Sequence, residues 1–282
     1  MSIEPSPFGW SSRSRHGDDL RTSEPGPMTP YVRNMIGSMP VPATGELVTY
    51  QLVDGTAMIV MDDGKANALS LEMLSALNRA LDRAASDGAV VVLTGRHGIF
   101  SGGFDLKVLG AGGPDASDML EQGFLLALRL LGHPAPVIIA CNGHAVAMGI
   151  FLLLSGDYRI GVNGPFRLVA NEVAIGLTMP QTAIEICRQR LAPSHFNRAV
   201  ILAENYAPAD AVEAGFLDRV VDGPELLETA RTVATELAQL DRAAHAATKS
   251  RARESAIAAI RKGLEIDQKF FRRLKAVPAG DE

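Results

Sequence analysis

The chain begins to show regular apolar patterns near Leu47, and its first pattern predicts a hairpin followed by a helix. Leu47–Val53 and Thr56–Asp62 favour strands and flank Asp54-Gly55, a pair typical of two-residue turns between antiparallel strands. Ser70 is a good N-cap residue, and after it an apolar residue recurs every three or four positions. These apolar positions are Leu71, Leu74, Leu77, Leu81 and Ala84.

Two short apolar runs, Ala89–Leu93 and Val137–Ala140, predict strands that are buried on both faces. A helix is expected between them, around 116–131, and the proline-rich segment 133–136 ends it. Shorter strands are expected at Asp157–Val162 and Phe166–Ala170. Further helices are expected at Met148–Leu154, Pro180–Leu191, Pro193–Ala203, Ala209–Ala214, Pro224–Gln239 and in a last segment to about Lys275. Strands interleaved with helices, followed by a helical tail, predict an α/β fold.

Residues 1–46 differ in composition from the rest of the chain. They carry seven of the sixteen prolines, Pro5, Pro7, Pro25, Pro27, Pro30, Pro40 and Pro42. No apolar period of a helix or a strand runs through them, so they are expected to form a flexible extension. Met28, Met35 or Met39 could each be the true start of the protein.

Composition and charge exclude several classes of function. The net charge of −5 disfavours a general nucleic-acid binder. Two cysteines, Cys141 and Cys187, are too few for a disulfide scaffold or a zinc cluster, and no metal site is expected. The longest apolar run, 145–154, is half of the ~20 residues that a membrane span needs, and the first thirty residues lack the apolar core of a signal peptide. We therefore expect a soluble, cytoplasmic protein without a membrane partner.

Candidate chemistry lies at two junctions where the chain leaves a buried strand. The segments are Ile99–Lys107 and Cys141–Gly149, and both are rich in glycine. Glycines at such places let backbone N–H groups point toward a ligand, and two such groups can form an oxyanion hole. Taken alone, the two segments are better interpreted as ordinary glycine turns.

Four segments together resemble the crotonase superfamily of enoyl-CoA hydratases and isomerases, in the order and spacing of that family. They are Gly64-Lys-Ala-Asn-Ala-Leu69, Phe100-Ser-Gly-Gly-Phe-Asp-Leu-Lys107, Asn142-Gly-His-Ala-Val-Ala-Met-Gly149 with Asp157-Tyr-Arg159, and Asn171-Glu-Val-Ala-Ile-Gly-Leu177. The resemblance implies a spiral of β-β-α turns over 47–235, carrying an acyl-CoA site. It also implies a helical trimerisation region over 236–282, and hence a homotrimer or a dimer of trimers.

The resemblance also implies roles for individual residues. Phe104 and Met148 match the positions whose backbone N–H groups form the oxyanion hole. Both donate through the backbone, so their bulky side chains leave the hole intact but reshape the acyl pocket. The implied contacts with substrate and coenzyme A are Ala66, Ala68, Gly103, Asp105, Leu106, Lys107 and Gly149. No cofactor is implied beyond the coenzyme A of the thioester substrate.

The chain departs from the hydratase pattern at one of two glutamates. Glu172 matches the second glutamate, whereas the first position holds Phe151, which would line the acyl pocket and cannot transfer a proton. A single carboxylate suffices for a 1,3-proton shift, so Δ3,Δ2-enoyl-CoA isomerisation with Glu172 as base is the preferred interpretation. The alternatives are an enoyl-CoA hydratase of fatty-acid β-oxidation and a non-catalytic acyl-CoA-binding member.

Other residues have weaker claims to function. Glu172 itself could be a solvated loop acid, although burial in its apolar surroundings would raise its pKa toward that of a base. His144 is a lesser candidate for an acid or base, and Cys141 is expected in the core. The basic run 249–275 is interpreted as a solvated helix face rather than a lip around phosphates. Its apolar stripe is assigned to packing between subunits, through Ile257, Ile260, Leu264, Phe271 and Leu274.

Overall fold

The structure is a computed structural model that describes residues 46–272. The expected extension over 1–46 therefore lies outside the described residues, apart from Glu46, as does the expected end of the last helix beyond Arg272. Within this part of the chain, no helix is both long and apolar enough to cross a membrane.

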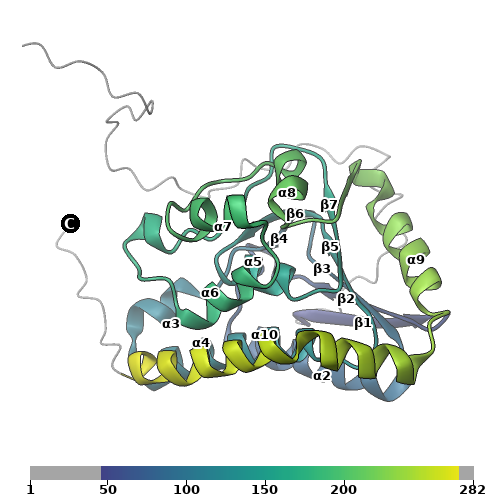
Figure 1. Ribbon diagram of the computed structural model, residues 1–282, viewed down its shortest axis with the longest axis horizontal. Helices are drawn as coiled ribbons and strands as arrows, with labels where there is room; N and C mark the ends of the chain where they lie inside the picture. Colours follow the sequence, from purple (N-terminus) through teal and green to yellow (C-terminus); the bar gives the residue numbers. More distant parts are fainter. Residues whose placement is uncertain (1–45, 273–282) are drawn as a thin grey trace, which may run out of the picture. The chain divides into compact units, whose positions relative to one another are not determined.

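Two sheets form the centre of the described chain (Figure 1). The larger sheet has the strand order β1-β2-β3-β5-β7-β9, in which only the pair β1–β2 is antiparallel. Its strands are β1 (Val48–Val53), β2 (Thr56–Met61), β3 (Val90–Thr94), β5 (Val137–Cys141), β7 (Tyr158–Val162) and β9 (Arg219–Val221). The smaller sheet is parallel, with the order β4-β6-β8. Its strands are β4 (Gly98–Ser101), β6 (Gly143–Val146) and β8 (Leu168–Val169).

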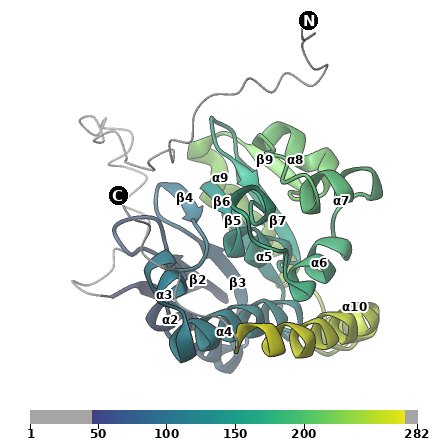
Figure 2. The same cartoon turned by 90° about the vertical axis from the view of Figure 1, so that its left-hand side faces the viewer.

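Successive strands alternate between the two sheets. From β3 to β9 each odd-numbered strand joins the larger sheet, and each even-numbered strand joins the smaller one. Helices follow these pairs: α3 (Leu106–Ala111) and α4 (Gly113–Leu131) after β4, α5 (Met148–Leu154) after β6, and α6 (Gln181–Arg188) after β8. This repetition is a spiral of β-β-α turns, and it confirms the predicted fold class (Figure 2).

The first predicted unit forms as its sequence indicates. β1 and β2 pair across Asp54-Gly55, where both residues adopt positive φ, the conformation that this turn requires. Ser70 caps α2 (Leu71–Asp87), because its side chain accepts a hydrogen bond of 3.2 Å from Met73 N–H.

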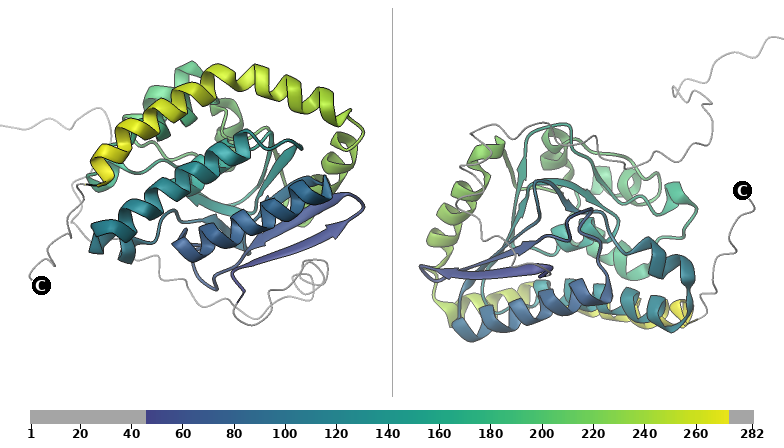
Figure 3. Two further views of the ribbon diagram at one scale, coloured as in Figure 1. Left: turned by 90° about the horizontal axis from the view of Figure 1, so that it is seen from below. Right: turned by 180° about the vertical axis from the view of Figure 1, so that it is seen from behind.

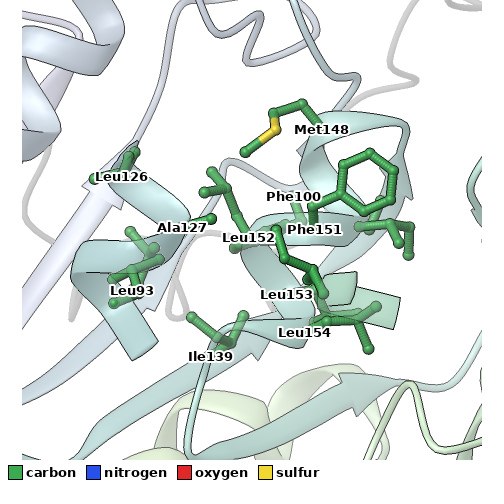
Figure 4. Packing of buried hydrophobic residues seen from close by; sticks show 14 of the residues in the cluster. Leu93, Phe100, Leu126, Ala127, Ile139, Met148, Phe151, Leu152, Leu153 and Leu154 are labelled. Carbon is green, nitrogen blue, oxygen red and sulfur yellow. The ribbon is translucent and has the colours of Figure 1, made fainter. Parts of the chain in front are cut away.

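Helices cover the sheets and enclose one core. α4 lies between α2 and α10 (Arg242–Phe271), as Figure 3 shows from below. The remaining helices are α7 (Pro193–Val200), α8 (Pro208–Ala214), α9 (Leu226–Leu237) and the short 3₁₀ turns η1 (Val173–Ile175) and η2 (Gly223–Glu225). Figure 4 shows α5 at the centre, where Met148, Phe151 and Leu152 pack with Phe100. α5 is therefore held by apolar contacts on all sides.

The described part of the apolar stripe on α10 packs inside its own chain, which corrects its assignment to subunit packing, while Leu274 lies outside the described residues. Ile260, Leu264 and Phe271 are 0%, 5% and 3% exposed, and α10 lies against α4 and α6. The carboxylate of Asp267 accepts hydrogen bonds from the first two N–H groups of α6, at 2.9 and 2.8 Å. The helix tail thus caps α6 across 86 residues of sequence.

The basic run at the start of α10 is also less solvated than expected. Lys249 is buried, and its Nζ lies 2.6 Å from Asp157 Oδ2. Arg253 binds the other oxygen of Asp157 at 2.8 Å and donates to the Leu131 carbonyl at the end of α4. Because Asp157 precedes β7, these bonds fix α10 to the spiral, and the interpretation of a purely solvated face is wrong at these two positions.

Candidate active site

Three strands of the smaller sheet end at one edge, and each is followed by a candidate site residue. β4, β6 and β8 run parallel, so their carboxyl ends lie together. Phe104 lies three residues after β4, Met148 two residues after β6, and Glu172 three residues after β8. The sheet therefore gathers residues that are far apart in sequence at one edge.

A buried asparagine holds the first loop in place. The Asn67 side-chain amide donates to the carbonyls of Met61 and Phe100, at 3.0 and 3.2 Å. The Asn67 carbonyl accepts a hydrogen bond of 2.8 Å from Ser101 Oγ, which in turn accepts one from Gly103 N–H at 3.2 Å. The loop after β4 is thus bound both to the strand before it and to the segment 64–69.

The peptide between Gly103 and Phe104 is oriented from its carbonyl end. Leu69 N–H donates to the Gly103 carbonyl at 2.8 Å. Because C=O and N–H point in opposite directions across a trans peptide, Phe104 N–H faces away from Leu69. Among residues 46–272 it has no hydrogen-bond acceptor. The two loops also meet here, since a Cβ atom on Gly103 would lie 3.3 Å from Met148 N.

The second loop contains a strained residue directly before its candidate donor. Ala147 has φ 49° and ψ −123°, a backbone conformation that costs a non-glycine residue about 1–3 kcal/mol. Its N–H donates to the Val169 carbonyl at 3.0 Å, which ties the loop to β8. Met148 N–H, at the start of α5, has no acceptor within the described residues. Gly149 packs so closely on Ser101 that a Cβ atom would overlap the Ser101 carbonyl oxygen.

Glu172 is a buried carboxyl group with an unpaired oxygen. The residue is 8% exposed, and within the described chain Oε2 has no hydrogen-bond partner, nor does Oδ1 of the neighbouring Asn171. Burial raises the pKa of Glu172 to about 7, against a smaller opposing contribution from its own backbone N–H. The alternative of a solvated loop acid is therefore wrong, and the group can exchange protons near neutral pH.

Phe151 lies in the core rather than at an open surface. Its ring is 1% exposed and stacks on Phe124 with centroids 6.2 Å apart. Phe124 also meets Phe104 edge-on and stacks on Phe271 of α10. An apolar aromatic cluster thus surrounds Phe151, the position that the family resemblance assigns to the first hydratase glutamate.

The first turn of α3 exposes two of the expected coenzyme A contacts. Asp105 caps this helix by accepting hydrogen bonds from Lys107 N–H and Val108 N–H, at 2.8 and 3.4 Å. Leu106 is 73% exposed and Lys107 is also exposed. The capping role explains the aspartate in structural terms, while Leu106 and Lys107 are free to meet a ligand.

Ala66 and Ala68 lie in the segment that borders the first loop. The Ala66 carbonyl accepts a hydrogen bond of 2.8 Å from Gly102 N–H. Ala68 N–H donates to Asp63 at 2.9 Å. Both alanines are half-buried beside the loop that carries Phe104.

The contacts and burial of His144 and Cys141, the weaker candidates for a chemical role, explain these residues in structural terms. His144 Nδ1 accepts a hydrogen bond of 3.0 Å from Arg167 N–H, its ring meets Phe166 edge-on, and burial lowers its pKa. Cys141 lies in the core as expected, and burial raises the pKa of its thiol to about 12, which disfavours a nucleophilic role. Residues 46–272 contain no cluster of three or more side chains that could hold a metal ion.

Comparison with known families decides the identity of the fold. The family described as enoyl-CoA hydratase/isomerase matches residues 52–279, which is most of the chain. The chain belongs to the enoyl-CoA hydratase/isomerase family. An acyl-CoA thioester substrate is consistent with membership of this family.

Solved structures and a curated relative agree with this membership. An enoyl-CoA hydratase/isomerase family protein from Pseudomonas syringae is 47% identical, with a TM-score of 0.79 over 81% of this chain and 100% of that one. An enoyl-CoA isomerase from Mycobacterium tuberculosis is 46% identical, with a TM-score of 0.75 over 78% of this chain and 96% of that one; a second structure of it is named a probable enoyl-CoA hydratase. Mouse mitochondrial enoyl-CoA delta isomerase 1 is 29% identical over 64% of this chain, and the match spans 65% of the mouse protein.

The sequence did not identify two residues that organise this family member's site. Asn67 and Ser101 stand in segments that carried the resemblance, yet their buried hydrogen bonds join residues more than thirty positions apart. No local pattern indicates such bonds. Asn67 has a positive φ, which asparagine tolerates better than most residues. This backbone conformation is the one feature that the residue type could have suggested.

Proposed function

We propose that this protein is a Δ3,Δ2-enoyl-CoA isomerase in which Glu172 is the single general base. The Glu172 carboxylate removes a proton from C2 of a 3-enoyl thioester, and the electrons spread through the conjugated system onto the thioester oxygen. The N–H groups of Phe104 and Met148 stabilise that negative oxygen. Glu172 then returns the proton to C4, which gives the 2-enoyl thioester and restores the carboxylate. No water enters or leaves.

The observation that carries this proposal is the pairing of one buried carboxylate that has an unpaired oxygen with two unpaired N–H groups at one sheet edge. A base with a pKa near 7 is matched to proton transfer at neutral pH. Phe151 supplies no second carboxylate with which to hold water, and this favours isomerisation over hydration. The name of the mouse relative, an enoyl-CoA delta isomerase, supports the same choice.

The coenzyme A part of the substrate is proposed to run past the loop after β4. Ala66, Ala68 and Gly103 border this path, together with Gly149 from the second loop. The exposed ammonium group of Lys107 is free to meet a phosphate.

Hydratase activity is the second candidate, because structural neighbours at 46% identity are also named enoyl-CoA hydratases. A screen of purified protein against 3-enoyl, 2-enoyl and 3-hydroxyacyl-CoA thioesters tests the two activities together. Interconversion of the first two without 3-hydroxyacyl product is expected. Rapid hydration would favour the second candidate, and binding without any turnover would indicate a non-catalytic member.

The isomerase rate should depend on pH through Glu172. Only the ionised carboxylate accepts a proton, so kcat/KM is expected to rise with pH up to about 7 and to level off above it. Initial rates with a 3-enoyl thioester across this range measure the profile. A profile that falls as pH rises through 7 would contradict Glu172 as base.

The family resemblance leads us to propose a trimer or a dimer of trimers. Because Ile260, Leu264 and Phe271 of the α10 stripe are buried inside the chain, we expect other apolar residues to form such an interface. Ile201, Leu202 and Phe270 are 57%, 67% and 61% exposed. Light scattering should give a mass of three or six chains. A monomer at micromolar concentration would contradict the assembly.

A further inference from the structure

Gly123 interrupts the interior of α4 at a place where the helix meets the candidate site. Glycine in a helix interior costs about 1 kcal/mol relative to alanine, so a packing reason is expected. A Cβ atom on Gly123 would lie 2.5 Å from Cζ of the Phe104 ring and 3.6 Å from Cγ of Met148. The side chains of Phe104 and Met148, the two residues with the candidate N–H donors, therefore both lie close to Gly123.

The Phe104 ring has little freedom to move toward the core. Its edge contact is Phe124, with ring centroids 6.2 Å apart at an interplanar angle of 72°. Phe124 is itself stacked on Phe151 and Phe271, and is 1% exposed. Since packed interiors resist such shifts, a methyl group at 123 would turn the partly exposed Phe104 ring outward, away from α4.

The outward side is where an acyl chain must begin. A thioester oxygen that accepts hydrogen bonds from Phe104 and Met148 lies about 3 Å from both nitrogens. The first acyl carbons then lie beside the side chains of the same two residues. We propose that Gly123 is a specificity-determining residue: by seating the Phe104 ring on α4, it keeps the acyl path open. This inference rests on the proposed function, because it takes the oxyanion hole as given.

The test compares binding of hexanoyl-CoA and of free coenzyme A by calorimetry, which needs no turnover. Gly123→Ala should weaken hexanoyl-CoA binding about 10-fold and leave coenzyme A binding unchanged. Phe104→Leu in the Gly123→Ala background should restore acyl binding, because the smaller side chain removes the overlap. Gly132→Ala, at the end of the same helix, is the matched control, since its Cβ would meet nothing closer than 3.4 Å.

The possible outcomes distinguish failure of the inference about Gly123 from failure of the proposed function. Equal hexanoyl-CoA affinity in Gly123→Ala and wild type, or equal losses for both ligands, would overturn the inference alone. Should Gly123→Ala unfold, the double variant is expected to fold as the wild type does; if it unfolds too, the glycine serves helix packing only and the inference is wrong. Failure of the wild type to bind hexanoyl-CoA would overturn the proposed function and this inference with it.

Discussion

Glu172→Gln is expected to lower the isomerisation rate by about 10²–10⁴, the usual contribution of a positioned acid–base group. The amide has nearly the shape of the carboxyl group but cannot accept the C2 proton at neutral pH. Acyl-CoA binding should persist, because the two N–H donors and the loop after β4 are unchanged. Steady-state rates with a 3-enoyl thioester, together with calorimetric affinity for hexanoyl-CoA, measure both effects.

Glu185→Gln provides the control for this substitution. Glu185 lies on α6 and forms a partly exposed ion pair with Arg188 at 3.2 Å, an interaction worth about 0–1 kcal/mol. Its replacement should leave the isomerase rate near that of the wild type. Full activity in Glu172→Gln would show that another group moves the proton.

Phe151→Glu is expected to destabilise the fold and to introduce hydration of 2-enoyl thioesters. The new carboxylate would replace a ring that is 1% exposed and stacked on Phe124, so we expect a loss of about 3 kcal/mol or more in the free energy of unfolding. In molecules that remain folded, a second acid would stand where hydratases hold water. Denaturant unfolding and 3-hydroxyacyl-CoA formation measure the two effects.

Phe151→Leu separates these effects. It removes the ring without adding a charge, so it should lose stability through the cavity alone and hydrate no faster than the wild type. Efficient hydration by the wild-type protein would contradict the one-base mechanism directly.

Long periodic segments made most of the fold predictable. The hairpin at Asp54-Gly55, the Ser70 cap and the apolar helix positions of α2 act locally, and each formed as expected. The buried strands β3 and β5 also followed, because unbroken apolar runs are typical of parallel strands with both faces covered.

Short elements around the site were not predicted. β4 and β6 have four residues each and include glycine, serine or histidine, and no strand was predicted at either place. They exist because parallel partners satisfy their backbone, a non-local cause that no window of sequence reveals. α3 and β9 were missed for the same reason, being short and context-dependent. The stripe on α10 correctly indicated a buried face but could not indicate which surface covers it.

The cap that Asp267 supplies to α6 has a consequence for biosynthesis. The first N–H groups of α6 are made 86 residues before the carboxylate that binds them. At about 5–20 residues per second, the nascent chain waits roughly 4–17 s for that partner. Throughout this interval the apolar faces of α4 and α6 lack the helix that covers them. The nascent spiral is thus an exposed intermediate until its last helix is synthesised, and a ribosome that stalls before Asp267 leaves a substrate for chaperones or proteases.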